Sequence, residues 1–300
     1  MSAAARAAYD TAVRAVVLDA DGLPELADLP EPDGPGRLVH IRSCGLCGSD
    51  VEKFGRAGEG TVLGHEIDGE LEDGTRVTVM HRVPCGGCER CRAGHESTCT
   101  AFAAVQISPG GFAERLTATH VVSLSGEVDG IWVEPVACIL RAADQVATGR
   151  SLVVGCGAVG LLWVQVLLER GFDVVVSEPR ADRLERALAL GAAVDDGPVT
   201  TAVLTAHDGL DDALVRLEPG GSALVFAAPP DPVPVSLDLV YRRELTVVGS
   251  RSATPDAFAA AVALLPSLVT PPVTSLPLDR FAEGVELYRR GDALKIAFTP

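Results

Sequence analysis

The stretch LVVGCGAVG, from Leu152 to Gly160, decides the fold of this 300-residue chain. A short apolar run leads directly into three glycines at G-x-G-x-x-G spacing, and a helical pattern follows them. In such a strand–turn–helix unit the glycines allow a tight turn, close approach of a pyrophosphate, and close packing of helix on strand. The N-terminus of the helix offers free N–H groups and the positive end of its dipole to phosphate. The stretch therefore predicts a dinucleotide site formed by Gly155, Gly157, Ala158, Val159 and Gly160.

The surrounding sequence has the pattern expected of such a unit. Between about residues 136 and 270, helical periodicity alternates with compact apolar runs that begin at Leu152, Phe172, Ser222 and Leu245. Continuous apolar strands separated by helices indicate βαβ units and a parallel sheet that is buried on both faces. A glycine turn in an unrelated α/β fold is the alternative interpretation of the motif.

A carboxylate, Glu178, follows the second apolar run. About twenty residues beyond the glycines, such a group would accept hydrogen bonds from the hydroxyls of a ribose. Its charge would also repel a 2′-phosphate, so we expect NAD rather than NADP. Arg183 lies close by in the sequence; we expect it to contact the cofactor, and its charge could soften this preference.

Four cysteines are spaced C-x2-C-x2-C-x7-C within one segment: Cys85, Cys88, Cys91 and Cys99. Four thiolates this close suit a tetrahedral zinc at about 2.3 Å per sulfur, with no position left for water. Disulfides are the alternative, but the chain shows no secretory signal, and cysteines spaced by two residues pair poorly as bridges. The spacing predicts a structural zinc that holds residues 85–99 in place and takes no part in chemistry.

The regions on either side of residues 136–270 have a different texture. Val13–Leu18, Leu38–Ser43 and Arg76–Met80 are short runs broken by glycine, proline and aspartate, which predicts an irregular β-rich region. Near the C-terminus we expect a helix at Asp279–Arg290 and a strand at Ala293–Phe298. A chain of 300 residues exceeds a typical single core, so two domains are expected.

Composition restricts the partners. A net charge of −16 repels phosphate backbones, so no nucleic-acid partner is expected. The longest apolar run, Leu161–Leu168, is far too short to span a membrane, and no membrane partner is expected. Met1–Arg14 contains no apolar signal core, so we expect a cytoplasmic location.

A second group of residues has ligand chemistry: CGLCGSD at Cys44–Asp50 and GHE at Gly64–Glu66. Cys44 and Cys47 could form half of another structural zinc, yet no further C-x-x-C completes it. Thiolate, imidazole and carboxylate instead make a mixed ligand set that suits a zinc with an open position. The alternative to a metal site is that the cysteine is an ordinary core residue and that the His-Glu pair lies on the surface.

The chain resembles the zinc-dependent medium-chain dehydrogenase/reductase family in the order of its motifs. These are Cys-Gly-x-Cys47-Gly-Ser-Asp50, Gly-His65-Glu66, the four-cysteine segment, Glu134-Pro135, the glycine turn and the closing Lys295 strand. The resemblance implies a β-rich, GroES-like catalytic domain at residues 1–135 and 271–300. It implies an NAD-binding Rossmann domain, an α/β doubly wound parallel sheet, at residues 136–270, with the active site in the cleft between the domains.

The resemblance also implies roles for single residues. Cys47 and His65 look like ligands of a catalytic zinc, and Glu66 and Glu134 look like carboxylates that complete its coordination or exchange in it. Asp50 would fix the ring of His65. Glu134-Pro135, where classical alcohol dehydrogenases have a cysteine, is similar to the polyol and sugar dehydrogenase branch.

The implied activity is that of an alcohol dehydrogenase of class EC 1.1.1. Zinc would lower the pKa of a secondary hydroxyl on a polyol, cyclitol or sugar-like substrate, and NAD would accept the hydride. Ser49 would take the alcohol proton first. Many relatives have histidine at the place of Glu52, so we expect Glu52 to relay that proton; an exposed helix charge is the alternative.

Two departures from the family pattern lie away from these residues. The chain is short between Glu66 and Arg76, and between Ala193 and Val203 a helix is expected to be missing.

Two alternative functions remain open. One is a carbonyl reductase of the same fold, and the other is an NAD- and zinc-binding scaffold or sensor without turnover.

The run Leu245–Val248 resembles the strand that pairs across a two-fold in family dimers, so we expect a homodimer or homotetramer. The cysteines not assigned to a metal site, Cys44, Cys138 and Cys156, are expected to be small buried residues. Four histidines are expected to be structural or exposed: His40, His81, His95 and His120.

Overall fold

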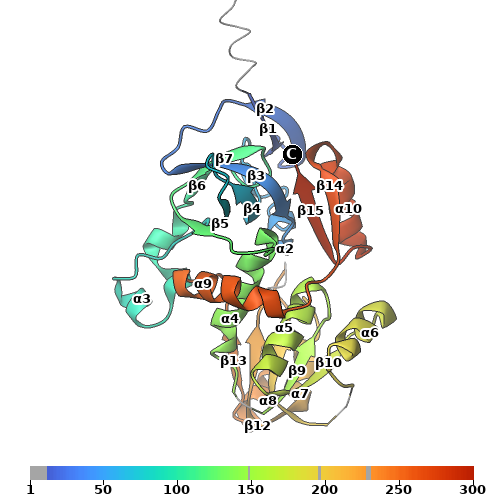
Figure 1. The fold of residues 1–300 in the computed structure, drawn as a ribbon. Coiled ribbons are helices and arrows are strands. Elements are labelled where there is room, and N and C mark those ends of the chain that lie inside the picture. Colours follow the sequence, from blue (N-terminus) through green and yellow to red (C-terminus); the bar gives the residue numbers. More distant parts are fainter. Residues whose placement is uncertain (1–11, 148, 195–196, 228–230) are drawn as a thin grey trace, which may run out of the picture. The chain divides into compact units, whose positions relative to one another are not determined.

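The computed structural model describes residues 12–147, 149–194, 197–227 and 231–300 (Figure 1). The stretch examined for a signal core therefore lies almost entirely outside the described residues. The chain forms two compact units. The first contains the described residues up to Pro135 together with Thr254–Ser267 and Pro272–Pro300; the second contains Val136–Ala253 and Leu268–Pro271.

These units differ from the expected domain boundaries at Thr254–Ser267, which belongs to the first unit, and at Pro271, which belongs to the second. The expected boundary at residue 270 followed the alternation of strands and helices along the sequence. The units are defined by contacts in space. The sequence does not indicate which unit the helix in Thr254–Ser267 packs against.

The first unit is built on an antiparallel hairpin, β1–β2, and an eight-stranded sheet. Its strands run in the order β14-β15-β3-β4-β5-β8, and β7 pairs with both β3 and β6. The strands are β1 (Val13–Leu18), β2 (Pro24–Leu29), β3 (Arg37–Gly45), β4 (Glu66–Glu70), β5 (Arg76–Val79), β6 (Ile107–Ser108), β7 (Arg115–Ala118), β8 (Val121–Ser123), β14 (Val273–Pro277) and β15 (Lys295–Thr299).

The C-terminal tail completes this sheet. Strand β15 pairs antiparallel with β3, which places Ala297 opposite Gly45. The helix α10 (Phe281–Arg290) packs on β15 closely enough that a side chain at Gly284 would overlap the ring of Phe298. The pairing brings residues near 295 beside residues 44–47, although they lie at opposite ends of the sequence.

The other helices of the first unit are short, except α9. They are α2 (Gly48–Val51), α3 (Glu89–Arg92), α9 (Pro255–Leu264) and the 3₁₀ turns η1 (Glu96–Thr98), η2 (Thr100–Ala103), η3 (Gly130–Trp132), η4 (Leu265–Ser267) and η5 (Leu278–Arg280).

The second unit is a parallel sheet with helices between its strands. Its strand order is β10-β9-β11-β12-β13, and every pairing is parallel. The elements are α4 (Val133–Ala143), β9 (Arg150–Val154), α5 (Ala158–Glu169), β10 (Asp173–Ser177), α6 (Ala181–Ala189), β11 (Val199–Leu204), α7 (Leu210–Arg216), β12 (Leu217–Val225), α8 (Leu237–Arg242) and β13 (Thr246–Gly249). The expected fold class, a Rossmann-type parallel sheet plus a β-rich domain, is confirmed.

The short segment before β11 explains the strand order. A six-stranded Rossmann sheet has the order 3-2-1-4-5-6, and removal of its third strand leaves the order seen here. Within the part of the chain that the structure describes, the outer edge of β10 carries a single bridge, between Val175 and Ala193. Ala193 exchanges backbone hydrogen bonds with Val174 and Val176, each 2.9 Å long. The segment expected to be shortened lies between Ala193 and Val203, and its residues 195 and 196 are outside the described residues.

Candidate active site

A buried carboxylate organises the turn that carries Cys47. Asp50 is fully buried on α2, and its carboxylate accepts hydrogen bonds from the backbone N–H groups of Cys47 (3.2 Å) and Gly64 (3.4 Å). Gly64 adopts a φ of +91°, and a side chain there would collide with the Cys44 sulfur and the Phe112 backbone. Glycine is therefore required for the chain to bring His65 next to the α2 turn.

Asp50 also holds the ring of His65. Its Oδ1 lies 3.2 Å from His65 Nδ1, an arrangement that leaves Nε2 as the ring atom free to bind a ligand. Burial alone would lower the pKa of His65, but the charge of Asp50 and its hydrogen bond outweigh burial, and the net shift is well upward. Burial likewise tends to raise the pKa of Asp50, and the neighbouring His65 reverses that shift.

Glu66 is paired inside the protein with a lysine from the C-terminal strand. Lys295 Nζ donates to Glu66 Oε2 and, at 3.2 Å, to the carbonyl of Leu46. The ammonium also lies 5.4 Å from the centre of the Trp132 ring. Burial tends to lower the pKa of Lys295, but the charge and hydrogen bond of Glu66, together with the charges of Cys47 and Glu134, outweigh burial and raise the pKa, so the lysine is a cation. The sequence analysis noted Lys295 only as part of the closing strand and gave it no role.

Three of the predicted site residues come together as a potential metal site. One ligand atom each from Cys47, His65 and Glu66 lie within 4.8 Å of one another, and both His65 and Glu66 are buried. A thiolate, an imidazole and a carboxylate are a donor set for a catalytic zinc, which takes three protein ligands and keeps one open position. The residues present therefore fit such an ion.

The other predicted residues surround this group at different distances. Ser49 Oγ lies 3.4 Å from Cys47 Sγ, to which it donates. Glu134 is buried but does not join the group, because its carboxylate lies more than 4.8 Å from at least one of the three ligand atoms. Its charge still acts on Lys295. Glu52 is half-buried directly after α2, beside the site.

His81 is a residue that the sequence analysis did not assign to the site. Its ring packs against that of His65, with the ring centres 4.6 Å apart. Burial and the charge of His65 lower the pKa of His81 to about 2, so its ring is neutral. Its position two residues beyond the buried strand β5 was the only sequence signal that could have suggested this placement.

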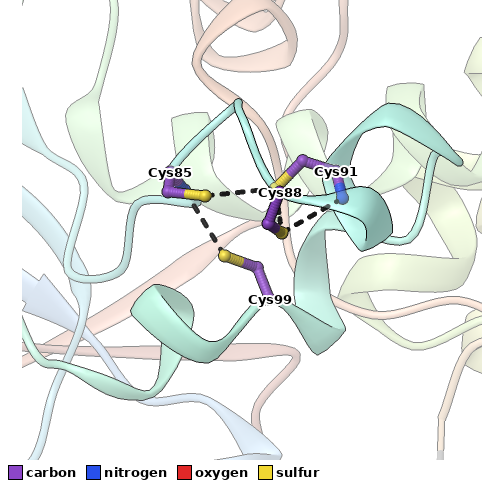
Figure 2. A group of neighbouring side chains, drawn as sticks. All are labelled: Cys85, Cys88, Cys91 and Cys99. Carbon is purple, nitrogen blue, oxygen red and sulfur yellow. Dashed lines mark hydrogen bonds between the residues drawn. The ribbon is translucent and has the colours of Figure 1, made fainter.

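The four cysteines of residues 85–99 converge as their spacing predicted (Figure 2). Their sulfur atoms all lie within 4.8 Å of one another, at 3.5 Å for Cys88–Cys91 and 4.0 Å for Cys85–Cys91. Sulfurs bound tetrahedrally at about 2.3 Å would be about 3.8 Å apart, so the cluster matches a zinc site. All four cysteines are free thiols, which leaves the alternative of disulfides without support.

Backbone N–H groups lower the pKa of two of these cysteines and so favour their thiolate forms. The N–H of Cys85 donates to the Cys99 sulfur at 3.5 Å and lowers the pKa of Cys99 to about 6. The N–H of Cys91 donates to the Cys88 sulfur and lowers the pKa of Cys88. Burial raises the pKa of Cys91 to about 12, so that thiol would need a metal ion to lose its proton.

In the second unit, the glycine turn joins β9 to α5. Gly155 has a φ of +89°, and a side chain at Gly160 would overlap the carbonyl oxygen of Gly155. At Gly157, by contrast, the nearest atom to an added Cβ is Arg183 Nη1 at 3.9 Å, so the turn is open there. Ala158 and Val159 form the first turn of α5, whose N–H groups face the same turn. This geometry leaves room for a phosphate where the sequence motif expects one.

Glu178 stands beside this turn, directly after β10. Its carboxylate accepts hydrogen bonds from the backbone N–H groups of Cys156 (2.7 Å) and Arg180 (2.9 Å). The carboxylate thus braces the turn, and its remaining lone pairs are available to a ribose. The next strand of the sheet beyond β9 also contributes, because Thr205 donates to the carbonyl oxygens of Val154 (3.0 Å) and Gly155 (2.8 Å).

Comparison with known proteins agrees with both units. Residues 36–125 match the family model of the alcohol dehydrogenase GroES-like domain. D-altritol 5-dehydrogenase of Agrobacterium fabrum is 31% identical over 270 residues, which cover 76% of this chain and 80% of that protein. L-galactonate-5-dehydrogenase of Escherichia coli is 28% identical over 77% of this chain and 80% of its own length.

A solved structure has the same fold. Acetophenone reductase from Geotrichum candidum, in complex with NAD, superposes with a TM-score of 0.85 at 21% identity, covering 97% of this chain and 98% of that one. The chain belongs to the zinc-type medium-chain dehydrogenase family and is an oxidoreductase. Within the described ranges, no helix has the length and apolar character that crossing a bilayer requires.

Proposed function

We propose that this protein is an NAD-dependent polyol dehydrogenase that interconverts a secondary hydroxyl of a polyhydroxylated substrate and the corresponding ketone. The observation that carries the proposal is the group of Cys47, His65 and Glu66, whose ligand atoms lie within 4.8 Å of one another, with His65 and Glu66 buried. Two relatives support the substrate class, because the names of both describe dehydrogenation at carbon 5 of a polyhydroxylated molecule.

In this proposal Cys47, His65 and Glu66 hold a zinc ion, and Cys85, Cys88, Cys91 and Cys99 hold a second, structural one. Glu134 is the further carboxylate that could enter the coordination of the first. A zinc bound by the first group would act as a Lewis acid toward the alcohol or ketone oxygen, and NAD would carry the hydride.

The chain's own residues orient these groups and move the proton. Asp50 fixes the His65 ring through Nδ1, and Lys295 neutralises the buried charge of Glu66. The hydroxyl of Ser49 lies 3.4 Å from the Cys47 sulfur, and we propose that it receives the proton of the substrate alcohol. Glu52, half-buried after the same helix, would pass that proton toward solvent. In the second unit, the turn at Gly155–Gly160 would hold the pyrophosphate, with Glu178 and Arg183 beside the ribose.

We also propose that the protein acts as a homodimer or homotetramer in a reducing compartment, the cytoplasm. Strand β13 ends the parallel sheet, and its apolar side chain Val247 is 42% exposed. An apolar sheet edge of this kind is usually covered by a partner. Eight free cysteines, four of them clustered, suit a reducing environment.

A substrate screen tests the proposal. The purified protein, with NAD and a panel of polyols that includes D-altritol and sorbitol, should form NADH at a rate that scales with its zinc content. If the fully zinc-loaded protein formed no NADH on any member of the panel and reduced none of the matching ketones with NADH, the proposed function would be wrong.

A further inference from the structure

Tyr288 brings a hydroxyl group to the Cys47 turn from the other end of the chain. It belongs to the face of α10 that also carries Phe281, Gly284 and Val285, which are buried against the core of the first unit. Since residues 281, 284, 285 and 288 share one side of a helix, the tyrosine ring continues this packed face. The close contact of Gly284 with Phe298 fixes the helix on β15.

The hydroxyl of Tyr288 lies over Gly48, between Cys47 and Ser49. A Cβ added at Gly48 would lie 2.8 Å from Tyr288 Oη and 3.9 Å from Cζ. Any side chain at position 48 would therefore displace this hydroxyl, although the backbone of Gly48 does not itself require glycine, because its φ is not positive. The glycine in Cys47-Gly48-Ser49 makes room for the tyrosine oxygen.

This hydroxyl is a hydrogen-bond donor without a partner among the described residues. Neighbouring polar groups are engaged: Ser49 donates to Cys47, Asp50 holds His65, and Glu66 pairs with Lys295. Tyr288 Oη makes no hydrogen bond to any described residue and is not fully buried. Since the oxygen is not fully buried and makes no such bond, its proton is available to a bound molecule that displaces water.

The chemistry of the phenol decides what kind of molecule this is. A tyrosine hydroxyl is a neutral group that donates one hydrogen bond and can also accept. A hydroxyl of a polyhydroxylated substrate can accept the hydrogen bond of Tyr288 Oη, which lies over Gly48 in the Cys47 turn.

We propose that Tyr288 is a specificity-determining residue that donates a hydrogen bond to a substrate hydroxyl other than the one being oxidised. The residue thereby selects polyhydroxylated substrates over simple secondary alcohols. This inference rests on the proposed function and goes beyond it, because it assigns the preference for polyols to one residue outside the metal-binding group.

The test compares Tyr288→Phe with the parent protein and with Tyr241→Phe, a matched control on α8 whose side chain is 83% exposed. The readouts are kcat/KM on D-altritol and on 2-butanol at saturating NAD, zinc content, and equilibrium binding of D-altritol in the presence of NADH. Loss of one hydrogen bond to the substrate should lower kcat/KM on the polyol about tenfold or more, mainly through KM. Polyol binding should weaken to the same degree, while kcat/KM on 2-butanol and zinc content should stay within about twofold of the parent.

A second variant tests the geometry. Gly48→Ala should reproduce the selective loss on the polyol, because the added methyl displaces Tyr288 Oη. In the Tyr288→Phe background the same change should have little further effect, since the ring carbon would lie at an ordinary contact distance of 3.9 Å.

The other outcomes overturn the proposal and identify the reason. An equal loss on both alcohols would give Tyr288 only a structural role at the Cys47 turn. A raised KM for NAD with an unchanged polyol KM would make the cofactor its partner. A parent protein that oxidises 2-butanol but neither binds nor oxidises any polyol would refute the proposed substrate class itself, and the role of Tyr288 with it.

Discussion

At the scale of single residues, the site depends on charges that neutralise one another inside the protein. Lys295 and Glu66 are each nearly fully buried, and an ion pair in such a place stabilises only while both partners are present. Asp50 and His65 form a second such pair within the same turn. The residues that would bind zinc are therefore held by groups that do not bind it.

Replacement of Lys295 by methionine tests this dependence. We expect Lys295→Met to lower the free energy of unfolding by about 3–5 kcal/mol, because the carboxylate of Glu66 would stay buried without its partner. The chain provides a matched control in Lys53, its only other lysine, whose side chain is 46% exposed and lies 3.9 Å from Asp50. Lys53→Met should cost less than about 1 kcal/mol. Urea denaturation would measure both, and an equal small loss for the two variants would contradict this account.

Some site residues could be predicted from the sequence and others could not. The ligand-type residues Cys47, His65 and Glu66 could be named from the sequence because each carries distinctive chemistry at a recognisable spacing. His81, Tyr288 and Lys295 could not, because their importance arises from tertiary contacts. A strand pairing between residues far apart in the sequence brings Lys295 to the site, and helix packing against β15 brings Tyr288 there.

At the scale of elements, the glycine turn and the four-cysteine segment have different physical requirements. The turn between β9 and α5 requires small residues so that backbone atoms can approach each other or a phosphate. The segment at residues 85–99 has very little core of its own: its buried cluster consists of Cys91, Cys99 and Phe102. Such a segment requires a metal ion to stay ordered.

Two alanine substitutions separate the roles of the glycines. Gly160→Ala should destabilise the protein and weaken NADH binding, because the methyl group would overlap the carbonyl of Gly155. Gly157→Ala should leave thermal stability nearly unchanged, since no atom lies closer than 3.9 Å to the new methyl, yet weaken NADH binding about tenfold or more. Differential scanning fluorimetry and fluorescence titration with NADH would measure the two effects. Full NADH affinity in Gly157→Ala would refute the assignment of the turn to the cofactor.

Loss of one cysteine should release the four-cysteine segment. Cys99→Ser is expected to remove one of two zinc equivalents per chain and to expose the bonds after Arg90 and Arg92 to trypsin, since both arginines lie on the exposed side of α3. Cys138→Ser, which changes a buried cysteine outside the cluster, should keep both metals and resist trypsin as the parent does. Metal analysis and limited proteolysis would decide, and unchanged zinc in Cys99→Ser would contradict the structural site.

Among the strands of the parallel sheet, β11 (Val199–Leu204) was not one of the predicted apolar runs. Its sequence, VTTAVL, contains two threonines and lacks the continuous apolar run of its neighbours. Thr201 is nonetheless fully buried, with its hydroxyl 3.4 Å from that of Ser222. A buried threonine with a cross-strand partner is recognisable only after the strands are paired. The runs that form β9, β10, β12 and β13 could be predicted because each is a short continuous apolar stretch that is visible in the sequence by itself.

At the scale of the whole molecule, the chain performs its proposed chemistry with a reduced nucleotide-binding sheet. Among the described residues, the bridge at Ala193 is what represents the third strand of the usual order. The loss lies at the β10 edge, whereas the glycine turn follows β9, the next strand in from that edge. The opposite edge, β13, is complete and exposes apolar side chains.

This exposed edge leads to a prediction for the assembled protein. Light scattering should give a mass of at least twice the 31.1 kDa of one chain. Val247→Lys, which places a charge on the edge strand, should shift the protein toward monomer without unfolding it. A parent protein that is monomeric at micromolar concentration would refute the proposed homo-oligomer.

The most direct test of the central claim compares two cysteines of the same C-x-x-C motif by zinc content and NADH formation. Cys44 is buried and lies outside the metal-binding group, whereas Cys47 belongs to it. We predict that Cys44→Ala keeps two zinc ions per chain and measurable polyol oxidation, and that Cys47→Ala keeps one zinc ion and loses turnover. A Cys47→Ala protein that retained two zinc ions and oxidised polyols at the parent rate would contradict the account.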